Sequence, residues 1–257
     1  MRIGGSAAAL LVALSLAGAC SRGEEPPKRV VPADAKRVDP ATTGTLSGRV
    51  RVDGPIPQNA PLSMAGDPVC AREHKGTATS ETYVGEDGGL GNVFVHVKDG
   101  LGNYAFDLPS DTVTLDQQQC KYVPHVFGAQ VGQQIEFVNS DPTVHTVHAL
   151  ANSNPEFNFS QPIRGQKDRK YFTNQEVMVE FRCKIHPWMS AYAGIVSHPY
   201  FAVTKANGQF EIRNLPPGTY TLEAWHEKLG TQTQRVTLAG HDSREVTFTF
   251  KAPAATP

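Results

Sequence analysis

Short segments in which apolar and polar residues alternate dominate the chain after residue 45. Alternation with a period of two places the apolar side chains on one face of a strand, and no segment of this region shows a sustained helical period. Turn signals such as Asn207-Gly208 separate the segments. Short strands separated by such turns predict an all-β fold made of sandwiches or barrels. The alternating sets are Val93, Val95 and Val97; Ile135 and Phe137; Val177, Val179 and Phe181; Phe210 and Ile212; Tyr220, Leu222 and Ala224; and Val246, Phe248 and Phe250.

The composition agrees with many turns and gives no sign of a nucleic-acid-binding surface. The 257 residues include 23 glycines and 19 prolines, the residues that favour turns. Lysine and arginine together number 24, and aspartate and glutamate 25, so no basic excess is available for a phosphate backbone. Hydrophobic residues make up 39% of the chain, which is enough for a sizeable core. We therefore expect a folded body that does not bind nucleic acid.

The first twenty residues predict export from a bacterial cell. A basic residue, Arg2, precedes an apolar run from Ala7 to Ala19. As a helix this run would rise only about 20 Å, short of the ~30 Å hydrocarbon core, so residues 1–19 are expected to be a signal peptide. The small residues before Cys20 resemble a bacterial lipobox, which implies a lipid on Cys20 and a lipoprotein of the inner or outer membrane facing the periplasm. The alternative is ordinary cleavage near Ala19 and plain secretion.

The segments at the two ends of the body lack any hydrophobic period. Residues 20–45 contain several prolines and mixed charges, so we expect them to form a flexible lipidated tether. Residues 252–257 are expected to be a disordered tail.

A sequence near the C-terminus carries a resemblance to a known module. Residues 204–225 read TKANGQFEIRNLPPGTYTLEAW, a turn and an alternating strand followed by Leu-Pro-Pro-Gly-x-Tyr. This resembles the carboxypeptidase regulatory-like module, a transthyretin-like β-sandwich similar to carbohydrate-binding modules. Residues 48–50 and 91–97 fit two earlier strands of that family. The resemblance implies that residues 46–105 and 201–251 are the two halves of one sandwich with a second domain inserted between them; consecutive domains are the alternative.

One cysteine, two histidines and a methionine have the spacing of a copper site. Cys183, His186 and Met189 are three residues apart and follow a predicted strand, and His145 lies upstream after another strand. A thiolate, two imidazoles and a thioether together select copper and describe a trigonal His₂Cys site with a weak axial methionine. In a regular strand His148 points away from the face of His145, so it is not expected to bind the same ion. The residues therefore predict one type 1 copper ion.

The same residues resemble those of the cupredoxins, the blue-copper proteins, over residues 106–200. Cys-x2-His-Pro-x-Met is similar to the ligand loop of the amicyanins, the cupredoxins of methylamine utilisation. The resemblance implies a Greek-key β-sandwich or barrel in which His145, Cys183, His186 and Met189 are the copper ligands. A vestigial site that binds no metal is the alternative.

Two further expectations come from that resemblance. The segment His145-Thr146-Val147-His148 resembles the cupredoxin strand His-Asn-Val-His, but Thr146 stands where asparagine usually joins the two ligand segments. A weaker connection between those segments is therefore implied. The resemblance also implies that His186 lies at the solvent edge of the copper, with Pro187 and Trp188 forming an apolar docking patch around it.

Two other cysteines, Cys70 and Cys120, need a separate explanation. In an exported protein the plain expectation is a disulfide, which would tie the N-terminal segment to the inserted domain. The alternative is a second metal site, because His74 follows Cys70 by four residues and His125 follows Cys120 by five.

The predicted site favours an electron carrier over an enzyme. Four protein ligands leave no open coordination position for a substrate, and the sequence has no His-x-His pair of the kind found in multicopper oxidases. We expect redox protein partners, such as a dehydrogenase or a cytochrome. The alternatives are copper capture and delivery, or a surface-anchored module that binds a glycan or protein through aromatic residues of the sandwich such as Tyr220 and Trp225.

The lipid anchor makes a testable prediction. If Cys20 is acylated, the protein is expected to sediment with membranes, because two or more acyl chains give stable attachment. Cys20→Ala is expected to block lipidation and lipoprotein processing, as measured by mass spectrometry of the protein. Wild-type protein found wholly in the soluble fraction would show plain secretion instead.

Overall fold

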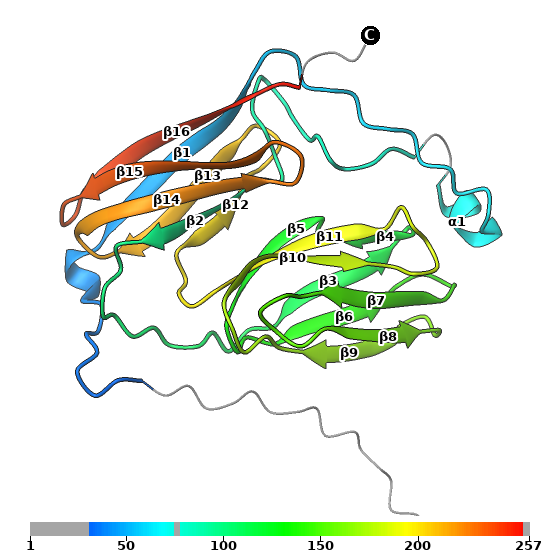
Figure 1. Cartoon of the computed structure of the whole chain (residues 1–257), viewed down its shortest axis with the longest axis horizontal. Helices are drawn as coiled ribbons and strands as arrows, with labels where there is room; N and C mark the ends of the chain where they lie inside the picture. Colours follow the sequence, from blue (N-terminus) through cyan, green and yellow to red (C-terminus); the bar gives the residue numbers. More distant parts are fainter. Residues whose placement is uncertain (1–30, 75–77, 254–257) are drawn as a thin grey trace, which may run out of the picture.

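The computed structural model describes residues 31–74 and 78–253. The expected signal peptide, Cys20 and the tether up to residue 30 lie outside the described residues, as do residues 254–257 of the expected tail. Within the described ranges, the regular elements other than the helical turn η1 (Pro40–Thr42) and the helix α1 (Pro68–Glu73) are β-strands. The prediction of an all-β fold is therefore confirmed. The strands form two β-sandwiches that lie side by side (Figure 1).

The first sandwich, here called the terminal sandwich, is built from strands near both ends of the chain. Its two sheets have the orders β13-β1-β16 and β12-β2-β14-β15. The alternating residues Val95, Leu222 and Phe248 fill its core, as the period of two requires. Its strands are β1 (Gly44–Asp53), β2 (Phe94–Asp99), β12 (Phe201–Val203), β13 (Gln209–Leu215), β14 (Gly218–His226), β15 (Gly230–Leu238) and β16 (Ser243–Lys251).

The second sandwich, here called the central sandwich, contains the strands that lie between β2 and β12 in the chain. Its sheets have the orders β5-β11-β10-β7-β8 and β4-β3-β6-β9. A cluster of aromatic rings that includes Phe127, Phe137 and Phe181 fills the space between them. Its strands are β3 (Val113–Gln118), β4 (Lys121–Val123), β5 (Val126–Gln130), β6 (Ile135–Asn139), β7 (His145–Leu150), β8 (Phe157–Gln161), β9 (Lys167–Lys170), β10 (Glu176–Arg182) and β11 (Ser190–Val196).

The described part of the expected tether packs against the terminal sandwich. The N–H of Lys36 donates to the carbonyl of Asn103 at 2.8 Å, and the N–H of Ala105 donates back to Lys36 at 2.9 Å. Strand β1 begins at Gly44, inside the range expected to be tether. The expectation of a flexible segment up to residue 45 is therefore wrong for residues 31–45, because backbone hydrogen bonds hold them.

The chain between β1 and β2 leaves the terminal sandwich and covers one end of the central sandwich (Figure 1). We call residues 60–74 and 78–80 the cap arm. Two backbone hydrogen bonds join the beginning of the arm to its end. The N–H of Leu62 donates to the carbonyl of Ala78 at 2.7 Å, and the N–H of Ser80 donates to the carbonyl of Ala60 at 2.9 Å. Met64, Cys70 and Ala78 belong to the hydrophobic core of the central sandwich. The expectation that all of residues 46–105 belong to the terminal sandwich is therefore wrong for the cap arm.

Aromatic side chains of the terminal sandwich pack directly on the backbone of the central one. The fully buried ring of Phe94 lies over Gly194 and Gly128, and Phe201 packs beside it with ring centroids 5.6 Å apart. A Cβ atom at Gly194 would lie 2.2 Å from Phe94. Because these two glycines have no side chain, the two phenylalanine rings can pack against the glycine backbone, and the two sandwiches are in direct contact there.

Gly194→Ala is expected to destabilise the protein by about 1–3 kcal/mol, because the added methyl group overpacks this interface. Gly66→Ala is the matched control, since a Cβ there meets nothing within 4 Å. It is expected to change the free energy of unfolding by less than about 0.5 kcal/mol. Denaturant unfolding measures both, and a Gly194→Ala protein as stable as the wild type would contradict the described packing.

Candidate metal centre

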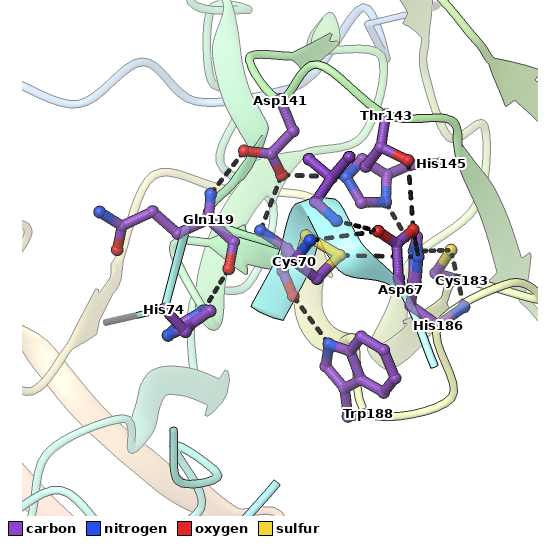
Figure 2. Close-up of a disulfide and its surroundings, with 12 residues drawn as sticks. Asp67, Cys70, His74, Gln119, Asp141, Thr143, His145, Cys183, His186 and Trp188 are labelled. Atoms are coloured by element: carbon purple, nitrogen blue, oxygen red, sulfur yellow. Dashed lines mark hydrogen bonds and ion pairs between the residues drawn. A yellow bond between two sulfur atoms is a disulfide. The ribbon is translucent and has the colours of Figure 1, made fainter. Parts of the chain in front are cut away.

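Three predicted ligands converge in the interior of the central sandwich. The side chains of His145, Cys183 and His186 offer ligand atoms that all lie within 4.8 Å of one another. The two Nδ1 atoms of His145 and His186 are 2.9 Å apart, and Cys183 Sγ lies 3.7 Å from Nδ1 of His186. The exposed fractions of the three residues are 0%, 3% and 2%. The donors thus face one another in a site shielded from water (Figure 2).

Strand pairing explains this convergence. Strands β7 and β10 are antiparallel neighbours, with Arg182 opposite His148. The first residue of β7, His145, therefore lies near the residue that follows β10, Cys183. The loop after Cys183 then turns back, because the N–H of Cys183 donates to the carbonyl of Met189 at 3.2 Å and the N–H of Met189 donates to His186 at 2.9 Å. Met189 is buried in the same core cluster, so a thioether lies in this loop as predicted.

Thr146 joins the two ligand segments directly. Its hydroxyl accepts a hydrogen bond from the N–H of Lys184 at 2.7 Å and lies 3.7 Å from Cys183 Sγ. Its backbone N–H donates to the same sulfur at 3.4 Å. Thr146 therefore makes the connection between the two ligand segments, through the loop backbone and the sulfur, and its lower strength relative to asparagine stays a prediction.

The surroundings of Cys183 favour the thiolate. Burial would by itself raise the pKa of the thiol, but hydrogen bonds from His145 and His186, and from the backbone N–H groups of Thr146 and His186, outweigh it and lower the pKa to about 5. The thiolate is the form of cysteine that binds metals. The site is therefore arranged to present a charged sulfur beside two imidazole nitrogens.

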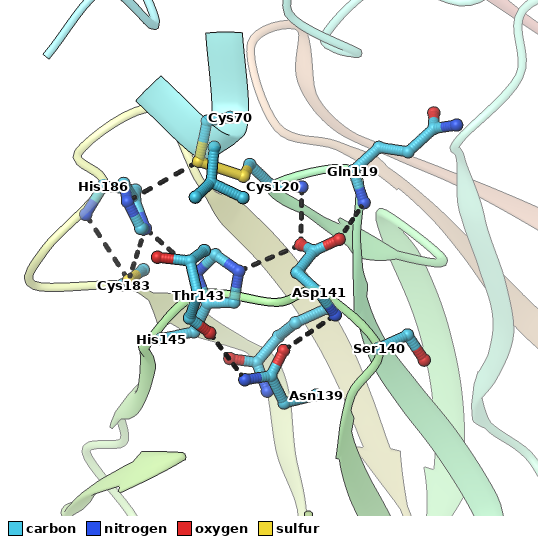
Figure 3. A network of polar contacts seen from close by, with 12 residues as sticks. Cys70, Gln119, Cys120, Asn139, Ser140, Asp141, Thr143, His145, Cys183 and His186 are labelled. Carbon is cyan, nitrogen blue, oxygen red and sulfur yellow. Dashed lines mark hydrogen bonds and ion pairs between the residues drawn. A yellow bond between two sulfur atoms is a disulfide. The ribbon is translucent and has the colours of Figure 1, made fainter. Parts of the chain in front are cut away.

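A carboxylate holds the outer nitrogen of each candidate histidine ligand. Nε2 of His145 donates to Asp141 at 2.9 Å, and Nε2 of His186 donates to Asp67 at 3.0 Å (Figure 3 shows the first pair, Figure 2 the second). Because each outer nitrogen is occupied, the Nδ1 atoms are the ones left for a metal. Sequence reasoning missed both aspartates; Asp67 precedes Pro68 at a helix start, but no local signal shows that it faces His186.

His186 does not lie at the solvent edge, so that expectation is wrong. The cap arm covers it: Asp67 bonds its Nε2, and the sulfur of Cys70 lies 3.6 Å from the same nitrogen. Of the expected docking patch, Pro187 is exposed, whereas Trp188 is half-buried and donates its indole N–H to the carbonyl of Cys120 at 3.0 Å. The Trp188 and His186 rings contact each other with centroids 5.0 Å apart and planes tilted by 44°. Ile185 beside them is 44% exposed.

Cys70 and Cys120 form a disulfide with an S–S distance of 2.07 Å. Disulfide sulfurs are not thiolate ligands, and the two histidines of the alternative second metal site contact other groups. His74 bonds the carbonyl of Gln119, and His125 bonds the Ser190 carbonyl at 3.0 Å and the Glu227 carboxylate at 2.6 Å. The alternative second site is thus not formed in this structure. The disulfide instead ties the cap arm to the central sandwich.

The remaining candidate residues serve other contacts. His148 bonds Glu156 through Nε2 and is not part of the metal-ligand cluster, in agreement with its strand parity. Tyr220 is buried and donates its hydroxyl proton to the carbonyl of Pro216, and Trp225 packs against Tyr192 with ring centroids 5.1 Å apart. The buried Tyr220 ring is therefore not accessible to a glycan, whereas Trp225 is half-buried, and a glycan or protein partner of the sandwich stays a prediction.

Comparison with known proteins confirms the resemblance of the C-terminal segment. The carboxypeptidase regulatory-like domain family matches residues 195–251. No curated protein matches the chain. No helix among the described residues has the length and apolar character needed to span a membrane.

Solved structures with some similarity to this chain include three copper proteins. A methionine-to-alanine mutant of amicyanin in the Cu(I) state is 18% identical over 39% of this chain and 97% of amicyanin, with a TM-score of 0.30. A purple cupredoxin from Nitrosopumilus maritimus is 16% identical over 32% of this chain and 98% of its own, with a TM-score of 0.27. A copper-containing nitrite reductase from Thermus scotoductus SA-01 is 25% identical over 35% of this chain, with a TM-score of 0.30. The match spans only 24% of the reductase.

The geometry predicts different roles for His145 and His148. His145→Ala opens a coordination position, so any visible copper band is expected to weaken or turn green and to recover partly with added imidazole. His148→Asn is the matched control and is expected to leave the band in place, because its ring contacts Glu156 outside the cluster. Absorption spectra of the copper-loaded variants measure both. Loss of the band in His148→Asn with its retention in His145→Ala would contradict the assignment.

Proposed function

We propose that this protein is a type 1 copper protein that carries single electrons between redox partners in the bacterial cell envelope. The observation that carries the proposal is the buried cluster of Cys183, His145 and His186, whose sulfur and nitrogen donors face one another. One thiolate and two imidazoles, with the thioether of Met189 in the same loop, are the donor set that selects copper and a trigonal geometry. The residues present therefore fit a copper ion.

When bound, the copper would supply a one-electron couple between Cu(I) and Cu(II). The chain would hold both oxidation states in nearly the same environment, because strand pairing and backbone hydrogen bonds fix the donors before metal binds. All donors come from the protein and are shielded from water, which suits electron transfer better than substrate conversion. The burial of the site likewise disfavours rapid copper release to an acceptor, and therefore a delivery role.

Electron partners would approach the loop that carries the ligands. Ile185 and Pro187 are exposed there, and the Trp188 ring contacts the His186 ring. A small apolar patch of this kind is typical of transient redox contacts. We infer that a dehydrogenase or cytochrome docks on this patch and that Trp188, rather than a bare histidine edge, lies between the partner and the site.

The proposed location is the periplasmic side of the envelope, with Cys20 lipidated as the membrane anchor. The disulfide between Cys70 and Cys120 suits an oxidising compartment. The terminal sandwich, which contains residues 201–251 of the carboxypeptidase regulatory-like segment, would serve as the support for the central sandwich, through the interface of Phe94.

The decisive test is the visible spectrum of the copper-loaded, oxidised protein. Charge transfer from the Cys183 thiolate to copper is expected to give an intense blue colour. Cys183→Ser is expected to abolish the colour with the fold intact by circular dichroism, whereas Cys20→Ala, which changes a cysteine 163 residues before Cys183, is expected to retain it. A folded wild-type protein that binds copper without colour would refute the proposal.

A further inference from the structure

His186 is held by a residue from outside the sandwich that contains the metal site. Asp67 belongs to the cap arm and lies 119 residues from His186 in the chain, yet its Oδ2 accepts the Nε2 hydrogen bond at 3.0 Å. Thr143 donates to the same oxygen at 3.2 Å. The other oxygen, Oδ1, caps α1 by accepting from the N–H groups of Val69 and Cys70 at 2.7 and 3.1 Å. Asp67 thus joins a candidate ligand to the backbone of a disulfide-bonded cysteine.

His145 is also held by an aspartate, but this aspartate belongs to the central sandwich itself. Oδ2 of Asp141 accepts from Nε2 of His145 at 2.9 Å and from the N–H of Cys120 at 2.7 Å. Oδ1 accepts from the N–H of Gln119, and the side chain of Asn139 accepts from the N–H of Asp141 at 3.0 Å. Each histidine is therefore bonded to an aspartate, and each aspartate to the backbone of one half of the disulfide (Figures 2 and 3).

We propose that Asp67 is a positioning residue of the metal centre and that the Cys70–Cys120 disulfide holds it in place. The proposal rests on the proposed function only in taking His186 to be a metal ligand. By accepting a hydrogen bond from Nε2 of His186, the carboxylate fixes the ring orientation that aims Nδ1 at Cys183.

Different parts of the chain hold the two aspartates in position. Asp141 lies four residues before His145, on a turn whose bond to Asn139 stays within the central sandwich. Asp67 reaches its position only because the cap arm folds over the site, and the disulfide is the covalent link between that arm and the sandwich. The metal centre is therefore complete only when the arm is docked.

The first experiment compares Asp67→Asn with Glu73→Gln in the full-length protein loaded with copper. Both substitutions remove one negative charge from the cap arm, but Glu73 is exposed at the end of α1, away from the site. Because a carboxylate makes the bonded imidazole a stronger donor, Asp67→Asn is expected to shift the reduction potential to more positive values. Glu73→Gln is expected to leave it unchanged. Equal potentials for Asp67→Asn and the wild type would overturn the proposal.

The second experiment measures affinity for copper(I) by competition with a chromogenic chelator, which does not depend on electron-transfer activity. Asp67→Ala is expected to weaken binding about 10- to 100-fold, the usual effect of removing such a hydrogen-bond partner. It is also expected to abolish the slowly exchanging Nε2 proton of His186 in NMR spectra of the copper(I) protein. An unchanged affinity with the proton signal retained would overturn the proposal. If the wild type is not blue but these effects appear, only the proposed function fails.

The role of the disulfide is tested by a double-mutant cycle. The variant Cys70→Ser with Cys120→Ser is expected to weaken copper(I) binding as much as Asp67→Ala does, and adding Asp67→Ala to it is expected to have little further effect. Hydrogen exchange in the strands of the central sandwich shows whether the variant remains folded. If the combined variant is folded and its loss of copper(I) binding free energy equals the sum of the losses in Asp67→Ala and in the double-cysteine variant, the disulfide does not hold Asp67.

Discussion

The covalent link between the cap arm and the central sandwich is the constraint on which the metal site depends. The Cys70–Cys120 bond links the cap arm covalently to the central sandwich, and Cys70 Sγ lies 3.6 Å from Nε2 of His186. Once the arm is held, Asp67 can serve two purposes at once, capping α1 and bonding the candidate ligand. The burial of His186 follows from this link, and so does the position of Trp188, whose indole bonds the carbonyl of Cys120.

The two sandwiches together hold the donor residues of the metal site in place. Phe94 from the terminal sandwich rests on Gly194 of β11, and β11 pairs with β10, the strand that leads to Cys183. His125 and Glu227 form a second buried contact between the sandwiches, at 2.6 Å. The donors are therefore fixed by packing and pairing that extend well beyond the ligand loop, which suits the proposed electron-transfer role.

The sequence allowed the strands and the central donors to be predicted, because both depend on local patterns. Period-two alternation identified the cores, and the spacing of Cys183, His186 and Met189 placed three donors on one loop. The cap arm could not be predicted, since residues 60–80 have no period and contact a sheet formed far along the chain. For the same reason the solvent edge assigned to His186 was wrong: a resemblance to a domain without this arm carries no information about Asp67.

The proposed copper ligands are the thiolate of Cys183 and Nδ1 of His145 and His186. X-ray absorption at the copper edge of the oxidised full-length protein measures this ligand set. We expect one short copper–sulfur distance together with two imidazole nitrogens in the first coordination shell. A shell of nitrogen and oxygen atoms without sulfur, in a protein whose Cys183 is reduced and intact, would rule this ligand set out.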